Sequence, residues 1–343
     1  MKYLITLILF FMLLGCKKNN EIYPCKGIPD EDQAFAFMYF KTESEGYLFG
    51  TLTHYQEMND KDLDDPNFSP QSTDEANIYK TLDGGNSWIK INSILNFSYF
   101  DIATYFNGGV YILRDNRSAY FKSSIVKFDL SSEKLKTYEI IKPISSVWHN
   151  DRNVNFTNNR GNIKLYKLDA MLLMLDSISI ENYVTDGLSM QSIDYGIFSD
   201  KGRTYFGSID YKSSEIELSI VPEKFIKQDE NNILIAGNNK KEDNEIDLVS
   251  YNVNTKKPTV IKEFKGYSIV QGLQSNDKVI AGFIGNISGA FTKYDLFYSL
   301  DKGRTWNIKK LDKQSYIRPS CLINDIMYIY SGGARIQKII LKD

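Results

Sequence analysis

The chain has 343 residues, of which 42% are hydrophobic and 13% aromatic, and its formal net charge is −2. This length and composition are sufficient for a large buried core and exclude a low-complexity or disordered polymer. The nearly balanced charge leaves no basic excess to neutralise phosphates, so nucleic acid is not expected as a partner. With only two histidines and three cysteines, we expect neither a metal nor another cofactor.

The N-terminus has the pattern of an export signal. Lys2 precedes an apolar run, residues 4–14, that is too short to span a bilayer as a helix. The run ends in Leu13-Leu14-Gly15-Cys16, which resembles the lipobox of bacterial lipoproteins, where the cysteine is acylated and becomes the new N-terminus. We therefore expect residues 1–15 to be a lipoprotein signal peptide and Cys16 to carry a palmitate-type acyl chain. Residues 16–30 would then be a polar tether that anchors the protein in the membrane of a bacterial cell envelope, with the leaflet and side left open.

The remaining cysteines are candidates for a disulfide. If Cys16 is acylated, Cys25 and Cys321 are left, one near each end of the mature chain. A compartment outside the cytoplasm permits disulfides, and a bridge here would close a very long loop. Two unpaired thiols fit the sequence equally well, because the sequence does not show whether the two Cα atoms approach each other.

From residue 31 onwards, short β-branched and aromatic runs alternate with Gly, Asn and Asp, which is typical of an all-β fold. Turns recur near Gly84, Ser131, Asn254 and Lys302, and the first and last pairs are 47 and 48 residues apart. This period matches one four-stranded antiparallel blade of a β-propeller. Residues 31–343 are predicted to form seven such blades, with six left open. One strand-like run recurs at residues 46–51, 109–113, 232–237, 278–283 and 326–332.

Two of the predicted turns share the pattern Ser/Thr-x-Asp-x-Gly-x-Thr/Ser-Trp. In such a turn the aspartate accepts hydrogen bonds from turn amides, the glycine permits a positive φ and the tryptophan packs against the sheet. The pattern resembles the Asp-box, or bacterial-neuraminidase repeat, of a broad set of β-propellers, in which it is structural and lies away from the catalytic face. The structural residues are then Thr81, Asp83, Gly85, Trp88, Ser299, Asp301, Gly303 and Trp306.

The blade register is hardest to assign between residues 161 and 223. Within it, residues 171–175 (Met-Leu-Leu-Met-Leu) fit either a buried strand or part of a helix. Residues 198–205 resemble a third copy of the turn pattern, with Phe198 and Tyr205 in place of the hydroxyl residue and the tryptophan. The same residues also fit an ordinary turn between other strands of their blade.

Within the Asp-box propellers, the obvious enzyme to test is a sialidase. That family has an N-terminal Phe/Tyr-Arg-Ile-Pro, three arginines that bind the substrate carboxylate, and a Tyr nucleophile paired with Glu. Here the Phe/Tyr-Arg-Ile-Pro motif is missing, and no arginine precedes residue 114. We therefore expect no sialidase chemistry. The eight arginines are Arg114, Arg117, Arg152, Arg160, Arg203, Arg304, Arg318 and Arg335.

A second resemblance points to a non-catalytic protein. Residues 39–51, followed by Ile78-Tyr79-Lys80 and the first turn motif, resemble a blade of the photosystem II stability/assembly-factor-like propellers. The resemblance implies an exported propeller that binds proteins. The intervening blades lack clean copies of the turn motif, and the arginine-lined patch of the photosynthetic members has no counterpart that we can locate.

The connection at residues 54–75 is unusually acidic, with seven carboxylates against Lys61. Asp60, Asp62 and Asp64 resemble the start of a calcium loop, but Asp65 stands where glycine is needed, so a solvated loop is favoured. In a propeller this second–third-strand connection lies on the face opposite the Asp-box turns. We therefore take His54, Tyr55, Asp60, Asp62 and Asp64 as the candidate contact loop. Its counterparts in later blades are residues 238–245 and 285–293.

Few other residues suggest chemistry. Trp148, His149, Tyr316 and Arg318 are compatible with an aromatic platform for a glycan, although packing within or between blades is favoured. No Gly-x-Ser-x-Gly, His-Glu-x-x-His or Cys-x-x-Cys pattern occurs. The sequence thus predicts a non-catalytic, lipid-anchored propeller that binds an envelope protein or serves in assembly. The alternative is a carbohydrate-active propeller, either glycan-binding or a sialidase-like glycoside hydrolase.

The lipobox interpretation predicts the behaviour of a Cys16→Ser variant. Without the thiol there is no acylation, so the variant is expected to move from the membrane fraction to the soluble fraction after cell fractionation. An unchanged distribution between the two fractions would refute the anchor.

Overall fold

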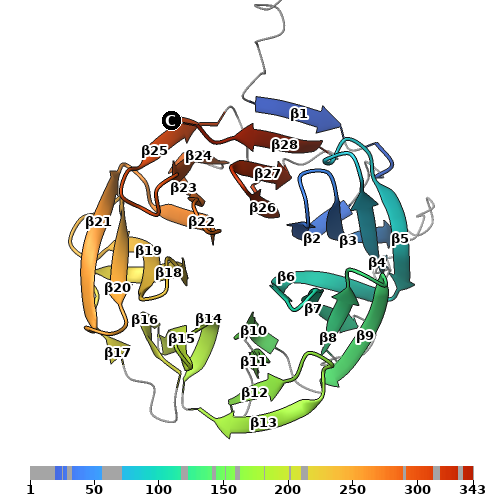
Figure 1. The fold of residues 1–343 in the computed structure, drawn as a ribbon, viewed down its shortest axis with the longest axis horizontal. Helices are drawn as coiled ribbons and strands as arrows, with labels where there is room; N and C mark the ends of the chain where they lie inside the picture. The colour runs from blue at the N-terminus through green and yellow to red at the C-terminus, as the bar shows by residue number, and fades with distance from the viewer. Residues whose placement is uncertain are drawn as a thin grey trace, which may run out of the picture.

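In the computed structural model the chain forms a ring of seven four-stranded antiparallel sheets arranged around a central channel (Figure 1). Among the described residues there is no helix that has the length and apolar character to cross a bilayer. The structure describes residues 20–24, 26–28, 33–55, 72–116, 123–140, 144–150, 152–158, 163–180, 182–200, 202–209, 215–288, 291–311, 317–330 and 335–342. The prediction of an all-β propeller is confirmed, with seven blades.

Each blade runs from an innermost first strand to an outermost fourth strand. The first three blades are β2 (Gln33–Phe40), β3 (Gly46–Tyr55), β4 (Ser72–Thr81) and β5 (Ile89–Leu95); β6 (Phe97–Phe106), β7 (Gly109–Asn116), β8 (Ser123–Asp129) and β9 (Lys134–Ile140); and β10 (Ile144–His149), β11 (Val154–Asn158), β12 (Lys164–Leu168) and β13 (Met174–Ser179). Blades 4 and 5 are β14 (Tyr183–Met190), β15 (Ile193–Asp200), β16 (Arg203–Ser208) and β17 (Glu215–Ile216); and β18 (Ile220–Lys227), β19 (Asn232–Asn239), β20 (Glu245–Asn252) and β21 (Lys257–Lys265). Blade 6 is β22 (Ile269–Ser275), β23 (Ile280–Ser288), β24 (Phe291–Ser299) and β25 (Asn307–Lys310), and blade 7 is β26 (Ser320–Ile323), β27 (Ile326–Tyr330), β28 (Arg335–Ile340) and β1 (Asn20–Pro24).

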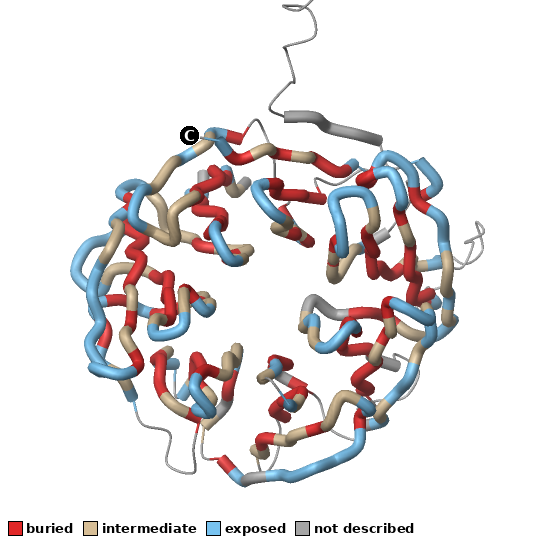
Figure 2. Tube along the Cα trace, viewed as in Figure 1, coloured by how far each residue is buried: buried red, intermediate tan, exposed pale blue. Residues whose placement is uncertain are grey.

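The core consists of apolar layers between neighbouring blades. The recurrent run predicted from the sequence forms the second strand of its blade, and its central residues are buried (Figure 2). Between blades 1 and 2, Tyr47 and Phe49 of β3 pack in one cluster with Val110 and Ile112 of β7. Because both faces of each sheet meet a neighbouring blade, these strands are continuously apolar instead of alternating.

The ring is closed by the N-terminal strand. β1 pairs antiparallel with β28 over five residue pairs, from Asn20↔Ile339 to Pro24↔Arg335. Beyond it, Ile28 is buried in the cluster between blades 7 and 1. Residues 20–24 therefore belong to the propeller, and the predicted tether of residues 16–30 is corrected to end before Asn20.

The two predicted turn motifs have the same geometry. Gly85 N donates to Thr81 Oγ1 at 2.9 Å, and Ser87 N donates to Asp83 Oδ1 at 2.9 Å. In blade 6, Gly303 N donates to Ser299 Oγ at 2.7 Å, and Thr305 N donates to Asp301 Oδ1 at 2.8 Å. Trp88 is buried and its Nε1 donates to Gly85 O at 3.0 Å, whereas Trp306 is partly buried against the core between blades 5 and 6. Both turns join the third and fourth strands, as expected.

The structure also decides the two open assignments between residues 161 and 223. Residues 198–205 lie in β15, the following turn and β16, so they form an ordinary second–third-strand connection instead of a third motif. Residues 171–175 form the third–fourth-strand turn of blade 3 and the start of β13. Four of these five side chains are exposed, so both sequence interpretations, buried strand and helix, are wrong.

The pairing of β1 with β28 predicts a difference in stability between two truncated chains. A chain of residues 26–343 lacks β1 and loses the ladder to β28, whereas a chain of residues 17–343 keeps it. At roughly 0.5–1.5 kcal/mol per hydrogen bond, the shorter chain is expected to unfold with a free energy lower by about 2–5 kcal/mol. Urea unfolding followed by circular dichroism measures this difference, and equal midpoints would contradict it.

Candidate functional site

The inner strands carry irregularities that shape the channel. In six of the seven blades the innermost strand shifts register against the second strand, which marks a β-bulge. A bulge redirects the side chains beside it, and bulges are frequent next to binding sites. In blades 4 and 5 the shifts lie at Val184/Asp186 and Pro222/Lys224, so these two charged residues follow directly after a bulge.

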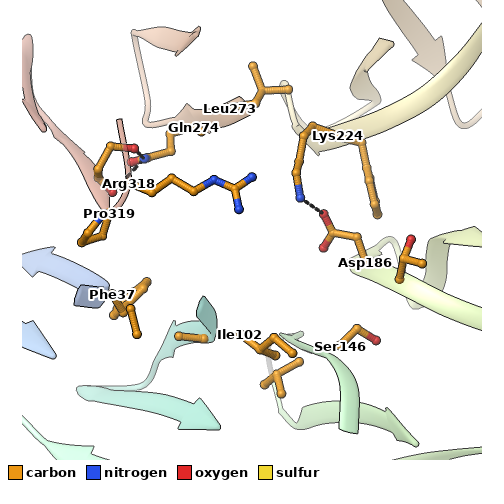
Figure 3. Close-up of a pocket in the computed structure, with 16 residues that line it drawn as sticks. Phe37, Ile102, Ser146, Asp186, Lys224, Leu273, Gln274, Arg318 and Pro319 are labelled. Atoms are coloured by element: carbon orange, nitrogen blue, oxygen red, sulfur yellow. Dashed lines mark hydrogen bonds and ion pairs between the residues drawn. The ribbon is translucent and has the colours of Figure 1, made fainter. Parts of the chain in front are cut away.

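A cavity of about 360 Å³ lies in the channel at the level of these bulges (Figure 3). Each of the seven blades contributes lining residues to this cavity. The lining residues are Ala36, Phe37, Ile102, Ala103, Ser146, Val147, Thr185, Asp186, Lys224, Phe225, Gly272, Leu273, Gln274, Arg318, Pro319 and Ser320.

One side of the cavity is charged. Lys224 Nζ of β18 lies 3.8 Å from Asp186 Oδ2 of β14, and the guanidinium of Arg318 extends into the cavity from just before β26 (Figure 3). Two cations and one carboxylate give this charged arc a formal charge of +1. A guanidinium and an ammonium that face one space are suited to bind an anionic group.

Burial controls the ionisation of Asp186. Its side chain keeps 34% of its surface exposed to the cavity, but the surrounding blades enclose it. This burial raises the pKa of the Asp186 carboxyl, while Lys224, the Gly187 amide and Arg318 oppose the rise. The protonated form of Asp186 therefore becomes populated at a higher pH than for an exposed aspartate, and in that form it no longer offsets the positive charge of Lys224.

The other side of the cavity is apolar. Phe37, Ile102 and Val147 from blades 1–3 line it, whereas Leu273 of blade 6 lies between Lys224 and Arg318, across the cavity from Phe37 and Ile102 (Figure 3). The wall between blades 6 and 7 is fixed by Gln274, whose Nε2 donates to Ser320 O at 2.9 Å and whose Oε1 accepts from Leu322 N at 2.7 Å. The cavity thus offers a charged arc and an apolar arc within one rigid ring.

The cavity spans the middle of the inner strands, and its Arg318 end lies toward the face opposite the turn motifs. Asp186 is in the first half of β14, and Arg318 directly precedes β26. Inner strands begin where the preceding blade ends, on the face that also carries the second–third-strand connections. The predicted contact loop, which joins β3 to β4, belongs to this same face.

The described part of the contact loop forms a polar cluster. His54 Nε2 lies 2.7 Å from Glu75 Oε2, and Lys90 Nζ donates to Glu75 Oε1 at 2.9 Å. Burial would raise the pKa of Glu75, but hydrogen bonds from Ser93, Lys90 and His54 outweigh it and lower the pKa to about 2. Tyr55 is 63% exposed. Asp60, Asp62 and Asp64 lie outside the described residues.

The structure does not gather the residues of the aromatic platform. Trp148 is buried between blades 3 and 4, and its Nε1 donates to Asp194 Oδ1 at 3.2 Å. His149 is exposed and stacks on Phe106, whereas Arg318 lines the channel. Tyr316 lies outside the described residues. Packing between blades, the favoured interpretation for Trp148, is confirmed.

Of the three cysteines for which the sequence makes predictions, the structure describes only Cys321. The thiol of Cys321 in β26 is buried, its Sγ accepts a hydrogen bond from Phe40 N at 3.4 Å, and burial raises its pKa to about 11. Pro24 of β1 is separated from β26 by β27 and β28. Cys16 and Cys25 lie outside the described residues, so acylation and the pairing of Cys25 with Cys321 stay predictions.

Sequence reasoning missed Asp186 and Lys224. Asp186 lies within residues 161–223, where the blade register was uncertain, and Lys224 follows them directly; the positions of the bulges were not evident from the sequence. The available signal was the presence of charged residues inside inner strands: Asp186 in Tyr183–Met190, and Glu223, Lys224 and Lys227 in Ile220–Lys227.

The described residues of the cavity lack the arrangement of a glycosidase. Asp186 is the carboxylate among them, and the nearby Glu223 instead accepts a hydrogen bond from Val270 N at 3.2 Å. A retaining or inverting glycosidase uses two carboxyl groups that flank the substrate. Arg318 is likewise the arginine among these lining residues, where a sialidase has three. No group of three or more potential metal ligands occurs in the part of the chain that the structure describes.

No model of a known protein family matches the sequence, and no curated protein matches it. The fold is similar to those of solved propellers. The β-propeller domain of the Trilobed protease from Pyrococcus furiosus is 15% identical, with a TM-score of 0.57 over 91% of this chain and 96% of that chain. A structure of oligogalacturonate lyase in complex with manganese is 12% identical, with a TM-score of 0.53 over 93% and 99%. The acylaminoacyl peptidase of Pyrococcus horikoshii is 11% identical, with a TM-score of 0.58 over 94% of this chain and 54% of that one. Such low identities show the fold alone and leave the function unresolved.

The charged arc predicts how Asp186 titrates. By carboxyl NMR, its pKa is expected above the ordinary value of about 3.9, and a Lys224→Met variant is expected to raise it further because an opposing cation is lost. Asp301 serves as the control, since hydrogen bonds led by that from Thr305 N hold its pKa at about 2. An Asp186 pKa that does not respond to Lys224→Met would contradict the arrangement.

Proposed function

We propose that this propeller is a non-catalytic binding module, held in the cell envelope by a lipid on Cys16, that receives an anionic segment of a partner protein in its channel. The single observation that carries the proposal is the cavity with one charged and one apolar arc. Arg318 and Lys224 face an apolar wall that includes Phe37 and Ile102.

The two arcs define the chemistry of the ligand. A carboxylate placed beside Arg318 and Lys224 replaces or supplements the interaction of Lys224 with Asp186. An apolar side chain attached to the same ligand is removed from water against Phe37, Ile102 and Val147. A peptide that ends in an apolar residue with a free carboxylate combines both features. A cavity of about 360 Å³ has room for one or two residues of such a peptide.

The same groups argue against catalysis. Asp186 interacts with Lys224 and has no second carboxylate opposite it among the described lining residues. Glu223 is bonded to the amide of Val270 and to Asn238 Nδ2, in the seam between blades 5 and 6. The alternative function, a carbohydrate-active propeller, therefore has less support than binding.

The binding function predicts a defined loss of affinity. A Lys224→Met and Arg318→Ala double variant is expected to bind short peptides with an apolar C-terminal residue at least tenfold more weakly than the unaltered protein, because the anionic group loses both cations. The control is Lys134→Met with Arg304→Ala, which removes the same charges from exposed positions outside the cavity. Fluorescence polarisation with a labelled peptide library measures the affinities.

Two further comparisons separate the candidate functions. Converting the peptide carboxylate to an amide is expected to weaken binding to the unaltered protein and to have little effect on the double variant. Equal affinities of acid and amide would overturn the anionic ligand. Turnover in a glycan-hydrolysis screen that is abolished by Asp186→Asn would instead establish the carbohydrate-active alternative.

A further inference from the structure

Blade 3 presents a short apolar turn to the solvent. Met171, Leu173, Met174 and Leu175, which we call the apolar turn, are 55%, 60%, 44% and 55% exposed. They fall within five consecutive residues, at the third–fourth-strand connection and the start of β13. Single exposed apolar side chains are normal, but a cluster of four on one turn indicates a surface that meets another apolar phase.

The backbone of the apolar turn is held in place. Asp169 Oδ1 accepts hydrogen bonds at 2.8 Å from the amides of Met171 and Leu173. Leu172, between these two residues, has a φ of 62° and is buried in the cluster between blades 2 and 3. One residue thus anchors the turn, and its neighbours are directed outward.

The neighbouring blade fixes the same turn from the other side. The carbonyl oxygen of Ala170 accepts a hydrogen bond from Tyr111 Oη at 2.8 Å and another from Lys127 Nζ at 3.0 Å. Both donors belong to blade 2. The exposure of the four apolar side chains is therefore a property of the folded ring.

The apolar turn and the entry point of the chain share one face of the propeller. The turn joins third and fourth strands, as do the two Asp-box turns. β1 begins on this face too, because Asn20 pairs with Ile339 and the nearby Leu341 N donates to Asp325 O in the first–second-strand turn of blade 7. Blades 7 and 3 lie on opposite sides of the ring (Figure 1).

The proposed lipid anchor brings this face close to a bilayer. Three residues, 17–19, separate Cys16 from Asn20 in the sequence. Four Cα–Cα steps extend at most about 14 Å. An acyl chain on Cys16 that enters a bilayer therefore keeps the start of β1, at the rim of blade 7, within that distance of the lipid headgroups.

We propose that the apolar turn of blade 3 enters the interface of the same bilayer, so that the propeller lies with its Asp-box face on the membrane. This inference rests on the lipid anchor of the proposed function. The lipid anchor alone also allows an orientation in which the ring is perpendicular to the membrane and only the edge of blade 7 lies near the bilayer. When the Asp-box face lies on the membrane, the apolar turn forms a second contact, in the boundary between headgroups and acyl chains. Removal of its apolar surface from water favours this orientation.

The two-point contact has a physical advantage for anchoring. Tethering by the first contact raises the local concentration of the bilayer at the second. In this orientation the contact loop and the Arg318 end of the channel cavity face away from the membrane, toward a partner in the aqueous compartment.

The test uses the full acylated protein in vesicles whose lipids carry bromine in the upper acyl chain. Tryptophan fluorescence added by Leu173→Trp is expected to fall to half or less in brominated vesicles relative to unbrominated ones. The matched control is Ile287→Trp, at a position that is 62% exposed at the end of β23 on the opposite face. Its added fluorescence is expected to stay unchanged. Met171→Trp serves as a second probe, and circular dichroism verifies the fold of each variant.

Flotation of the vesicles separates failure of the inference from failure of the anchor. If the unaltered protein does not float with the vesicles, the lipid anchor is refuted. If it floats but the tryptophan at position 173 is not quenched, the anchor stands and the membrane contact of the apolar turn is overturned. Protection of that tryptophan by a second copy of the chain or by a protein, seen as an equal signal in both vesicle types, also overturns the contact.

Discussion

Closure of the ring is the constraint on which the rest of the structure depends. Six blades are built from consecutive strands, but blade 7 takes β26–β28 from the end of the chain and β1 from its beginning. The pairing of β1 with β28 therefore joins the two ends of the chain through backbone hydrogen bonds. Without that ladder, blade 7 could separate from blade 1, and the channel would lose its fixed diameter. Together with the apolar cluster between blades 7 and 1, this pairing keeps all seven blades around one cavity.

The channel cavity depends in turn on local departures from regular pairing. A regular inner strand would alternate its side chains between its two faces throughout its length. A bulge interrupts that alternation, and six inner strands have one at a similar level. In blades 4 and 5 the interruption precedes Asp186 and Lys224, which therefore meet across the seam between blades. Arg318 completes the charged arc from a different blade, so no local segment contains the site.

Several elements were predictable because their signal is local. The second strands, such as Gly46–Tyr55 and Asn232–Asn239, are apolar runs bounded by turn residues, and they recur with the period of a blade. In the turn motif at Thr81–Trp88, the side chains of Thr81 and Asp83 form their hydrogen bonds within eight residues, so the geometry of the turn follows from its own sequence. Residues 171–175 were misassigned for the opposite reason. Their composition indicates burial, but the neighbouring blade accepts only Leu172 and leaves the other four exposed.

The sequence by itself determined the all-β class, the blade period, the turn motifs and the lack of a Phe/Tyr-Arg-Ile-Pro motif, because each of these depends on composition or on residues close together in the chain. Only the tertiary structure decided that Asn20–Pro24 closes the ring and that Asp186, Lys224 and Arg318 share one cavity. The physical reason is distance along the chain. β1 and β28 are separated by nearly the whole sequence, and the three charged residues come from three blades. Their approach is set by ring geometry and by bulges, which no local pattern of residues specifies.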